Sequence, residues 1–148
     1  MIEKELLVVD EAFKNKEELI YSLSQKANKL GKVSQVSHYM QSVLKREEEC
    51  STAIGFSVAI PHGKSESVKI PFVAFARPQP FIQWDNNNEE EIKLVFLIGV
   101  PKEQEGTVHL KILANISRKL IDEEFRSSLL QASSKEELYG LLTEVVQS

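Results

Sequence analysis

The sequence has few of the residue types that mark several common classes of protein. Among its 148 residues is one cysteine, Cys50, which cannot form an internal disulfide, so a disulfide-stabilised scaffold is excluded. The same cysteine cannot build a zinc site without several histidines nearby, and the chain has only three histidines. Clean apolar runs such as residues 94–98 (LVFLI) are much shorter than the 18 or more residues of a membrane-spanning helix. Basic residues are not in excess, since 18 Lys and Arg face 22 Asp and Glu, and this argues against a nucleic-acid-binding protein.

What the chain does contain is the composition of a folded globular protein. It is 42% hydrophobic and 27% charged, values that exclude an intrinsically disordered or collagen-like chain. The length fits one domain, and no internal repeat or long linker divides residues 1–148. The charged start, MIEKE, lacks the apolar region of a signal peptide. We therefore expect one cytoplasmic domain with no membrane insertion.

Sequence motifs for nucleotide and metal chemistry are missing as well. The chain has no GxxxxGK[ST] phosphate loop, no GxGxxG dinucleotide fingerprint and no HExxH zinc motif. Residues 55–59 (GFSVA) resemble part of a nucleophile elbow, but Ala59 replaces the second glycine and the segment leads into a strand. We interpret Ser57 as a structural strand residue. No cofactor and no metal are expected.

Hydrophobic periodicity predicts strands alternating with helices. Apolar residues at helical spacing predict helices over residues 16–30, 35–49, 108–120, 125–130 and 135–146, whereas short apolar runs predict strands over residues 6–9, 58–60, 72–76 and 92–100. The last run is the most apolar in the chain and is expected to be a central strand buried on both faces. Residues 61–63 (PHG) are expected to break the chain, and the polar residues 85–91 to connect a hairpin. The fold class expected is a three-layer α/β/α domain with a central mixed sheet.

Several residues are expected to cap these helices. Asn15 and Ser134 each precede a glutamate by three residues, which is the pattern of a capping box. Gly31 is placed to end the first helix, and Ser34 is expected to cap the second.

His62 is the first candidate for chemistry among the polar residues. It lies between Pro61 and Gly63 at the end of a predicted strand. Proline fixes its own backbone and extends the residue before it, while glycine permits unusual backbone angles and the close approach of a ligand. Such a segment would hold an imidazole rigidly at the surface. The alternative is a turn whose histidine is merely solvated.

The other candidates have simpler alternatives too. His109 lies near the start of the third predicted helix, two residues after the candidate cap Thr107, where free amides favour an anion. Taken alone, its position favours an ordinary surface histidine. Arg46, near the end of the second helix, could stabilise that helix terminus or pair with a following glutamate. Its guanidinium is nevertheless well shaped to bind phosphate oxygens. His38, inside the second helix, is assigned no role.

These residues belong to segments that resemble a known family. The likeness is to the enzyme IIA family, type 2, of the bacterial phosphoenolpyruvate-dependent sugar phosphotransferase system, the fructose/mannitol/nitrogen class. It covers nearly the whole chain in order and is most specific around the Pro-His-Gly segment. Departures are Cys50, where the family often has glycine, and the asparagines of residues 86–88, where it often has an Asp-Gly turn. The segments that carry the resemblance are 46–47 (RE), 52–64 (TAIGFSVAIPHGK), 68–71 (VKIP), 75–77 (FAR), 95–101 (VFLIGVP), 109–113 (HLKIL), 125–129 (FRSSL) and 134–138 (SKEEL).

The resemblance implies a phosphoryl carrier. By analogy, His62 is the phosphorylated nucleophile and reacts through its ε nitrogen, Arg46 and His109 stabilise the phosphoryl group, and Thr52 and Gly63 support the loop. The phosphocarrier HPr would donate the group, and a cysteine of enzyme IIB, which works with the membrane enzyme IIC, would receive it for sugar uptake of a fructose-like class. Because donor and product are both phosphohistidines, no nucleotide is needed.

Two other functions stay open at this point. The nitrogen-related members of the family use phosphorylation of the same histidine as a switch and act by binding other proteins. A chain without the activity would be a non-catalytic α/β interaction module.

Overall fold

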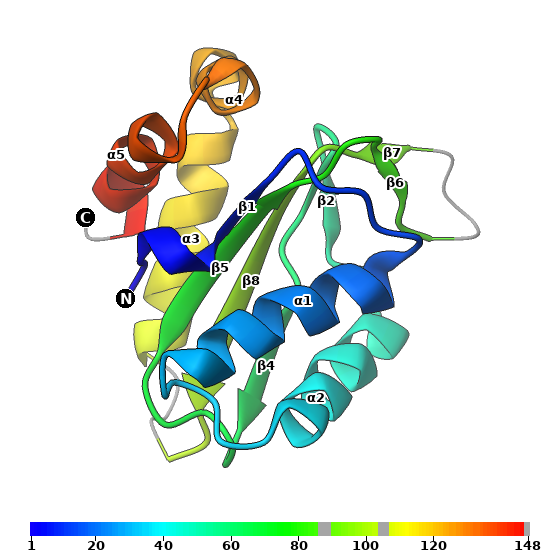
Figure 1. Cartoon of the computed structure of the whole chain (residues 1–148), viewed down its shortest axis with the longest axis vertical. Coiled ribbons are helices and arrows are strands. Elements are labelled where there is room, and N and C mark those ends of the chain that lie inside the picture. Colours follow the sequence, from blue (N-terminus) through cyan, green and yellow to red (C-terminus); the bar gives the residue numbers. More distant parts are fainter. Residues whose placement is uncertain (86–89, 104–106, 147–148) are drawn as a thin grey trace.

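A central sheet between two layers of helices organises the chain (Figure 1). The structure, a computed structural model, describes residues 1–85, 90–103 and 107–146, with the side chains of 107–109 left aside. Helices α1 (Lys16–Lys29) and α2 (Val36–Glu49) cover one face of the sheet. Helices α3 (Thr107–Leu120), α4 (Glu123–Gln131) and α5 (Lys135–Val146) pack on the other. The three-layer α/β/α prediction is confirmed.

The main sheet is mixed, as predicted, and contains six strands within the described residues. Its order is β1 (Leu7–Val9), β5 (Phe72–Arg77), β8 (Leu94–Pro101), β3 (Val58–Ala59) and β2 (Ala53–Gly55), and β4 (His62–Ser65) also pairs with β8. Strands β3 and β4 run parallel to β8, whereas β5 runs antiparallel to it. A short 3-10 turn, η1 (Lys4–Leu6), precedes β1.

Strand β8 lies at the centre and separates two hydrophobic cores. Phe96 and Ile98 face the layer of α3, α4 and α5, while Val95 and Leu97 face the layer of α1 and α2. This alternation follows from the two-residue period of a strand, and burial on both faces explains the continuous apolar run. The central strand is thus confirmed, but its predicted start was wrong. It begins at Leu94, because Ile92 belongs to a separate hairpin.

That hairpin is formed by β6 (Ile82–Gln83) and β7 (Glu91–Ile92), in which Ile82 lies opposite Ile92. It confirms that the polar segment 85–91 connects paired strands, although residues 86–89 themselves lie outside the described part of the chain. Lys93, between β7 and β8, donates its amide to the Ser57 carbonyl at 2.8 Å.

Most of the predicted caps are present. The Asn15 side chain accepts the Glu18 amide at 2.9 Å, and Ser134 accepts the Glu137 amide at 3.1 Å. Gly31 has a φ of +76°, the left-handed conformation that ends many helices. The prediction for Ser34 was wrong: Gln35 is the N-cap residue of α2, and the Ser34 amide and hydroxyl both donate to the Ser67 carbonyl.

Two further predictions near residue 60 were wrong. Ser57 is not a strand residue but part of the turn between β2 and β3, where its φ is +62° and that of Phe56 is +58°. The Pro-His-Gly segment is not a break from the sheet, because His62 and Gly63 belong to strand β4. Ala59 opposite Val95 and His62 opposite Ile98 keep the same register along β8. Pro61, which has no N–H to donate, interrupts the strand without displacing it.

Helix α2 approaches β4 closely because two glycines lie side by side beneath it. Gly63 and Gly99 are partners in the β4–β8 register. A Cβ on Gly63 would lie 2.7 Å from the Val43 side chain and 3.2 Å from the Tyr39 ring, and one on Gly99 would overlap the Phe72 ring. The Tyr39 ring packs edge-on against Phe72, and its hydroxyl donates to the Ile98 carbonyl at 2.8 Å. These contacts fix where α2 lies relative to His62.

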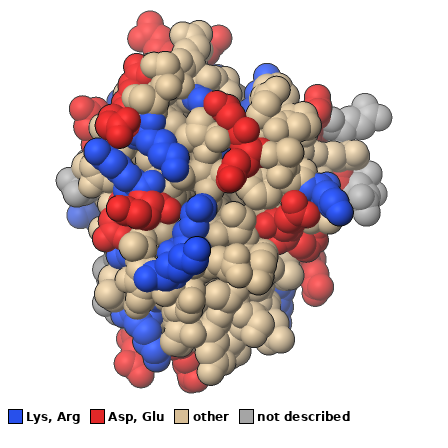
Figure 2. All heavy atoms as spheres, viewed as in Figure 1, with Lys and Arg blue, Asp and Glu red and all other residues tan. Residues whose placement is uncertain are grey.

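The charged surface is mixed in sign. On the face seen in Figure 2, lysine and arginine side chains lie among aspartates and glutamates rather than forming a basic patch. Among the described residues, no helix combines the length and apolar character needed to cross a membrane.

The glycine contact predicts the effect of a single methyl group. Gly63→Ala should destabilise the protein by about 1–3 kcal/mol, because the added Cβ overlaps α2 side chains and the helix must shift. Gly140→Ala is the matched control: this exposed residue lies within α5 with nothing near its Cβ position, and the change should stabilise by up to about 1 kcal/mol. Urea unfolding of both variants measures the difference. Equal stability of the two variants would contradict the close-contact argument.

Candidate functional site

His62 opens strand β4 and is held by its own backbone surroundings. The residue is half-buried, and Nδ1 of its ring lies 2.9 Å from the carbonyl oxygen of Ile60. Pro61, which is buried, lies between them, and its carbonyl accepts the Ile98 amide at 3.0 Å. The backbone on both sides of the ring is therefore tied to the sheet, and the imidazole is oriented by a bond to a fixed carbonyl.

This bond determines which ring nitrogen is nucleophilic. A carbonyl oxygen can only accept, so Nδ1 must carry the hydrogen that it shares with Ile60. In the neutral ring the hydrogen on Nδ1 leaves the lone pair on Nε2. The geometry thus selects the ε nitrogen as the basic atom of His62.

The surroundings also favour the neutral ring. The pKa of His62 is lowered from its usual value near 6.5, mainly by burial, which disfavours the charged imidazolium, and further by the Arg46 guanidinium. The hydrogen bond to Ile60 and the Glu47 carboxylate act in the opposite direction. Since burial prevails, the imidazole is predominantly neutral at neutral pH.

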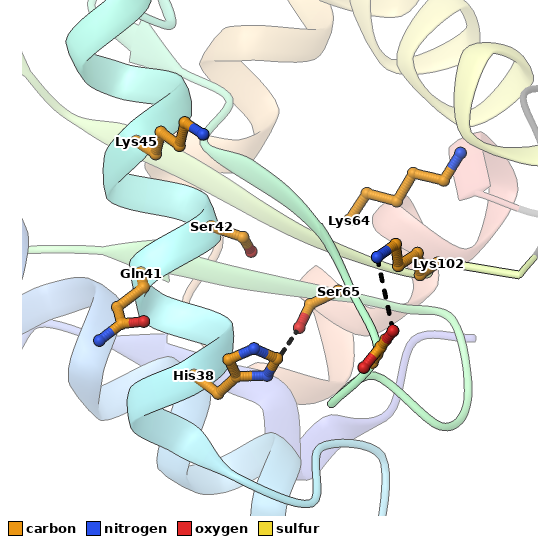
Figure 3. A pocket seen from close by; sticks show the side chains of 8 residues that line it. His38, Gln41, Ser42, Lys45, Lys64, Ser65 and Lys102 are labelled. Atoms are coloured by element: carbon orange, nitrogen blue, oxygen red, sulfur yellow. Dashed lines mark hydrogen bonds and ion pairs between the residues drawn. The ribbon is translucent and has the colours of Figure 1, made fainter.

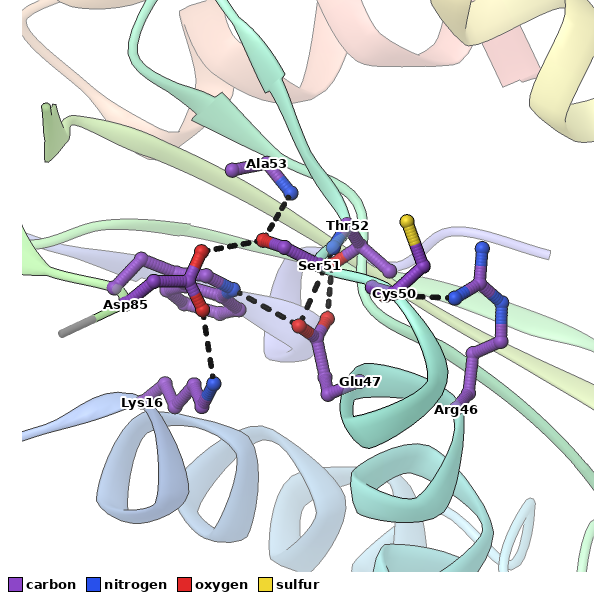
Figure 4. Close-up of polar contacts among 9 residues, drawn as sticks. Lys16, Arg46, Glu47, Cys50, Ser51, Thr52, Ala53 and Asp85 are labelled. Carbon is purple, nitrogen blue, oxygen red and sulfur yellow. Dashed lines mark hydrogen bonds and ion pairs between the residues drawn. The ribbon is translucent and has the colours of Figure 1, made fainter. Parts of the chain in front are cut away.

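Arg46 reaches the same place from the last turn of α2. Its side chain is half-buried, and one guanidinium nitrogen donates to the Cys50 carbonyl at 2.8 Å, beyond the helix end (Figure 4). Together with His62 it lines a groove of about 460 Å³ that is formed by residues of α2 and β4. Ser42, Lys45, Glu49, Gly63 and Lys64 complete the lining. The structure therefore brings His62 and Arg46 together, beside further cationic groups suited to an anion.

For His109 the structure describes the helix to which the residue belongs but not its side chain. The residue lies in the first turn of α3, but its side chain and that of the expected cap Thr107 are outside the described part of the structure. Strand alternation is informative here. Gly63 faces α2, so its neighbour His62 lies on the opposite face, the one that α3 covers.

Thr52 and Gly63 have different surroundings from those expected for a phosphate loop. Thr52 is buried and donates both its amide and its hydroxyl to the Glu47 carboxylate. Gly63 has no left-handed φ, and the group that approaches it closely is helix α2 rather than a ligand.

Glu47 was not predicted from the sequence as a functional residue. It entered only as one of the three glutamates with which Arg46 could pair, but it is only 7% exposed. Its carboxylate accepts from Thr52 and from the Trp84 indole, which donates at 3.2 Å (Figure 4). A signal was present in the sequence: Tyr39, Val43 and Glu47 follow one another at intervals of four along α2, which places Glu47 on the buried face.

A second hollow of about 540 Å³ continues along α2 and β4 (Figure 3). Lys45, Lys64 and Lys102 are among the residues that line it, and Lys102 pairs with Glu66 at 3.4 Å. His38 lines its far end, with Nδ1 2.6 Å from the Ser67 hydroxyl. Within residues 1–85, 90–103 and 107–146, no group of three or more His, Cys, Asp or Glu side chains could hold a metal ion.

Comparison with known sequences gives a consistent result. Residues 1–145 match the family described as "Phosphoenolpyruvate-dependent sugar phosphotransferase system, EIIA 2". The fructose-specific EIIA component of Haloferax volcanii is 38% identical over 97% of this chain and 92% of its own length. The 2-O-alpha-mannosyl-D-glycerate-specific EIIABC component of Escherichia coli is 32% identical over 94% of this chain, which spans only 21% of that longer protein.

Solved structures share the fold. The nitrogen regulatory protein IIA-Ntr of Neisseria meningitidis has a TM-score of 0.86 and 27% identity, with 96% of each chain covered. The mannitol enzyme IIA of Escherichia coli, in a complex with phosphorylated enzyme IIB, has a TM-score of 0.81 and 23% identity, covering 97% of this chain and 99% of that one.

The buried setting of His62 predicts its pH dependence. Its NMR titration midpoint should fall below about 6.5, the usual histidine value, because burial opposes protonation. The lower pKa in the folded state also means that the stability contributed by this group is present above pH ~6.5 and declines as the pH falls below it, since the unfolded chain takes up the proton first. The His62 resonance is assigned by its loss in His62→Ala. A midpoint above 6.5 would show that burial does not dominate.

Proposed function

This chain belongs to the EIIA type 2 family of the phosphoenolpyruvate-dependent sugar phosphotransferase system, and we propose that it carries the phosphoryl group on His62. The proposed donor is phosphorylated HPr, and the proposed acceptor is a cysteine of enzyme IIB, which acts with membrane enzyme IIC in sugar uptake. The fructose-specific relative from Haloferax volcanii, similar over nearly its whole length, supports a fructose-like substrate class. The complex of a structurally similar IIA with phosphorylated IIB supports the acceptor.

The observation that carries this proposal is the bond between Nδ1 of His62 and the Ile60 carbonyl. It leaves the Nε2 lone pair as the nucleophile, on a ring whose burial keeps it neutral. The neighbouring groove supplies Arg46, Lys45 and Lys64 for the charge of a phosphoryl group. The nucleophilic nitrogen, in a fixed tautomer, is therefore close to cations that can bind the transferred group.

The transfer needs no further reactant. The Nε2 lone pair of His62 attacks phosphorus in line, the new N–P bond forms as the N–P bond to the donor histidine breaks, and the donor ring recovers its electron pair. Nδ1 keeps its hydrogen throughout, so the phosphorylated ring retains its bond to Ile60. In the second step a thiolate of IIB attacks the same phosphorus, and the bonding pair returns to Nε2.

The roles proposed for the other residues follow from their positions. The Arg46 guanidinium stabilises the equatorial phosphoryl oxygens, a type of interaction whose loss commonly slows a reaction about 10²–10³-fold. His109, in the first turn of α3, is proposed to act on the same oxygens from the other side. Thr52 and Gly63 hold the surrounding backbone.

A second candidate function is regulation. The likeness to the nitrogen regulatory IIA-Ntr of Neisseria meningitidis favours it. In that case His62 would accept the phosphoryl group in the same way, and the modified surface would control the binding of another protein.

Phosphorylation of His62 can be tested by mass spectrometry after incubation with phosphoenolpyruvate, enzyme I and HPr. The unmodified chain should gain one phosphoryl group, and His62→Ala should gain none because the nucleophile is gone. His38→Ala, which changes a histidine at the far end of the adjoining hollow, should behave like the parent. A His62→Ala protein that is still phosphorylated would refute the assignment, and an unmodified parent would leave a non-catalytic interaction module.

The same reaction mixture separates the two functions. On addition of a IIB protein encoded beside this chain, a sugar-transport component should lose its phosphoryl group to the IIB cysteine. Retention of the group would favour the regulatory function instead.

A further inference from the structure

Glu47 is a buried carboxylate that the phosphoryl-transfer steps above do not use. It extends from the last turn of α2 and is 7% exposed. Burying a carboxylate is costly unless hydrogen bonds replace its hydration. Here the replacement comes from three donors, namely the amide of Thr52 at 3.3 Å, the hydroxyl of Thr52 and the indole of Trp84 at 3.2 Å (Figure 4). The three bonds tie the carboxylate to the segment after α2 and to Trp84.

The bonds of Glu47 lead to the reactive ring. Thr52, held by the carboxylate, accepts the Ile60 amide on its carbonyl at 3.0 Å. The carbonyl of Ile60 in turn accepts from Nδ1 of His62 at 2.9 Å. Three successive links therefore join a carboxylate on α2 to the nitrogen that sets the tautomer of the histidine on β4.

We propose that Glu47 is a positioning residue for phosphoryl transfer, which holds Thr52 and Ile60 so that the His62 ring presents Nε2. The inference rests on the proposed function of His62. Glu47 acts through Thr52 and does not touch the phosphoryl group. The neighbouring Arg46 has a different environment, because its guanidinium donates to the Cys50 carbonyl and its side chain lines the groove. The two adjacent residues therefore act from different sides of α2.

The charge of Glu47 has a second effect, which distinguishes it from a purely structural residue. Its carboxylate raises the pKa of His62, against the lowering caused by burial and by Arg46. Among the described residues, the charged groups that line the same groove are Lys45, Arg46 and Glu49 of α2 and Lys64 of β4; the side chain of His109 on α3 lies outside the described residues. Removing the Glu47 charge should therefore lower the His62 pKa further.

The decisive comparison is Glu47→Gln with Glu48→Gln. Glutamine keeps one acceptor oxygen, which can serve the Thr52 amide and the Trp84 indole that both donate to Oε2. Its amide then replaces Oε1, so the Thr52 hydroxyl loses the acceptor to which it donates. Glu48 is the exposed neighbour, and its substitution removes the same charge without these hydrogen bonds. Long-range ¹⁵N–¹H NMR of the unphosphorylated proteins reports both the His62 tautomer and its titration midpoint.

In the parent and in Glu48→Gln we expect the Nδ1–H tautomer and the same midpoint. In Glu47→Gln we expect a mixture of tautomers, a lower midpoint and phosphorylation by phospho-HPr slowed about tenfold, the effect of losing one hydrogen bond in the chain. A Glu47→Gln protein with the parental tautomer and midpoint would overturn the inference, and so would an equal change in Glu48→Gln.

Variants of Thr52 keep the test decisive if Glu47→Gln fails to fold. Thr52→Val removes the hydroxyl donor but keeps the shape and the backbone bonds, and it should broaden the tautomer distribution. Thr52→Ser restores the hydroxyl and should restore the parental spectrum. Parental spectra for Thr52→Val would contradict the inference. Because the NMR readout uses unphosphorylated protein, it separates a failure of this inference from a failure of His62 to accept the group.

Discussion

The close approach of helix α2 to the glycine pair of β4 and β8 is the contact on which the site depends. Without side chains at Gly63 and Gly99, the rings of Tyr39 and Phe72 can pack against the sheet. The helix then ends beside the first residue of β4. In this way one packing contact brings Arg46 and His62, which belong to different elements, to the same groove.

Around His62 the protein balances opposing electrostatic effects. Burial and Arg46 lower the pKa of the ring, and the Glu47 carboxylate raises it. The neutral ring is a nucleophile, while the cations of the groove are suited to the charge that arrives with a phosphoryl group. A backbone carbonyl, which cannot change its protonation state, fixes the tautomer. The nucleophilic character of Nε2 therefore follows from a backbone hydrogen bond to Nδ1.

The fold followed from the sequence wherever local signals and tertiary packing agree. The cap of Asn15 and the long apolar run ending in β8 are examples, since capping acts within one helix turn and double burial demands continuous hydrophobicity. Predictions failed where distant residues decide the structure. Proline and glycine beside His62 suggested a turn, but pairing with β8 makes the segment a strand.

The candidate site was likewise predicted where the residue type is informative and missed where distant contacts decide. The residue types at Arg46 and His62 were recognisable because their chemistry is specific, and the structure places both on one groove. Glu47 was missed because a glutamate within an acidic run is ordinarily solvated; its burial depends on Thr52 and on Trp84, which lies 37 residues away. Only the folded chain brings those donors to one carboxylate.

The central claim is that the backbone selects one ring nitrogen of His62 for phosphoryl transfer. The most direct measurement is ¹⁵N–³¹P NMR of the chain after reaction with phosphorylated HPr. The account predicts a phosphorus bonded to Nε2 of His62, with the hydrogen still on Nδ1. A phosphorus on Nδ1, or on another histidine, would contradict it.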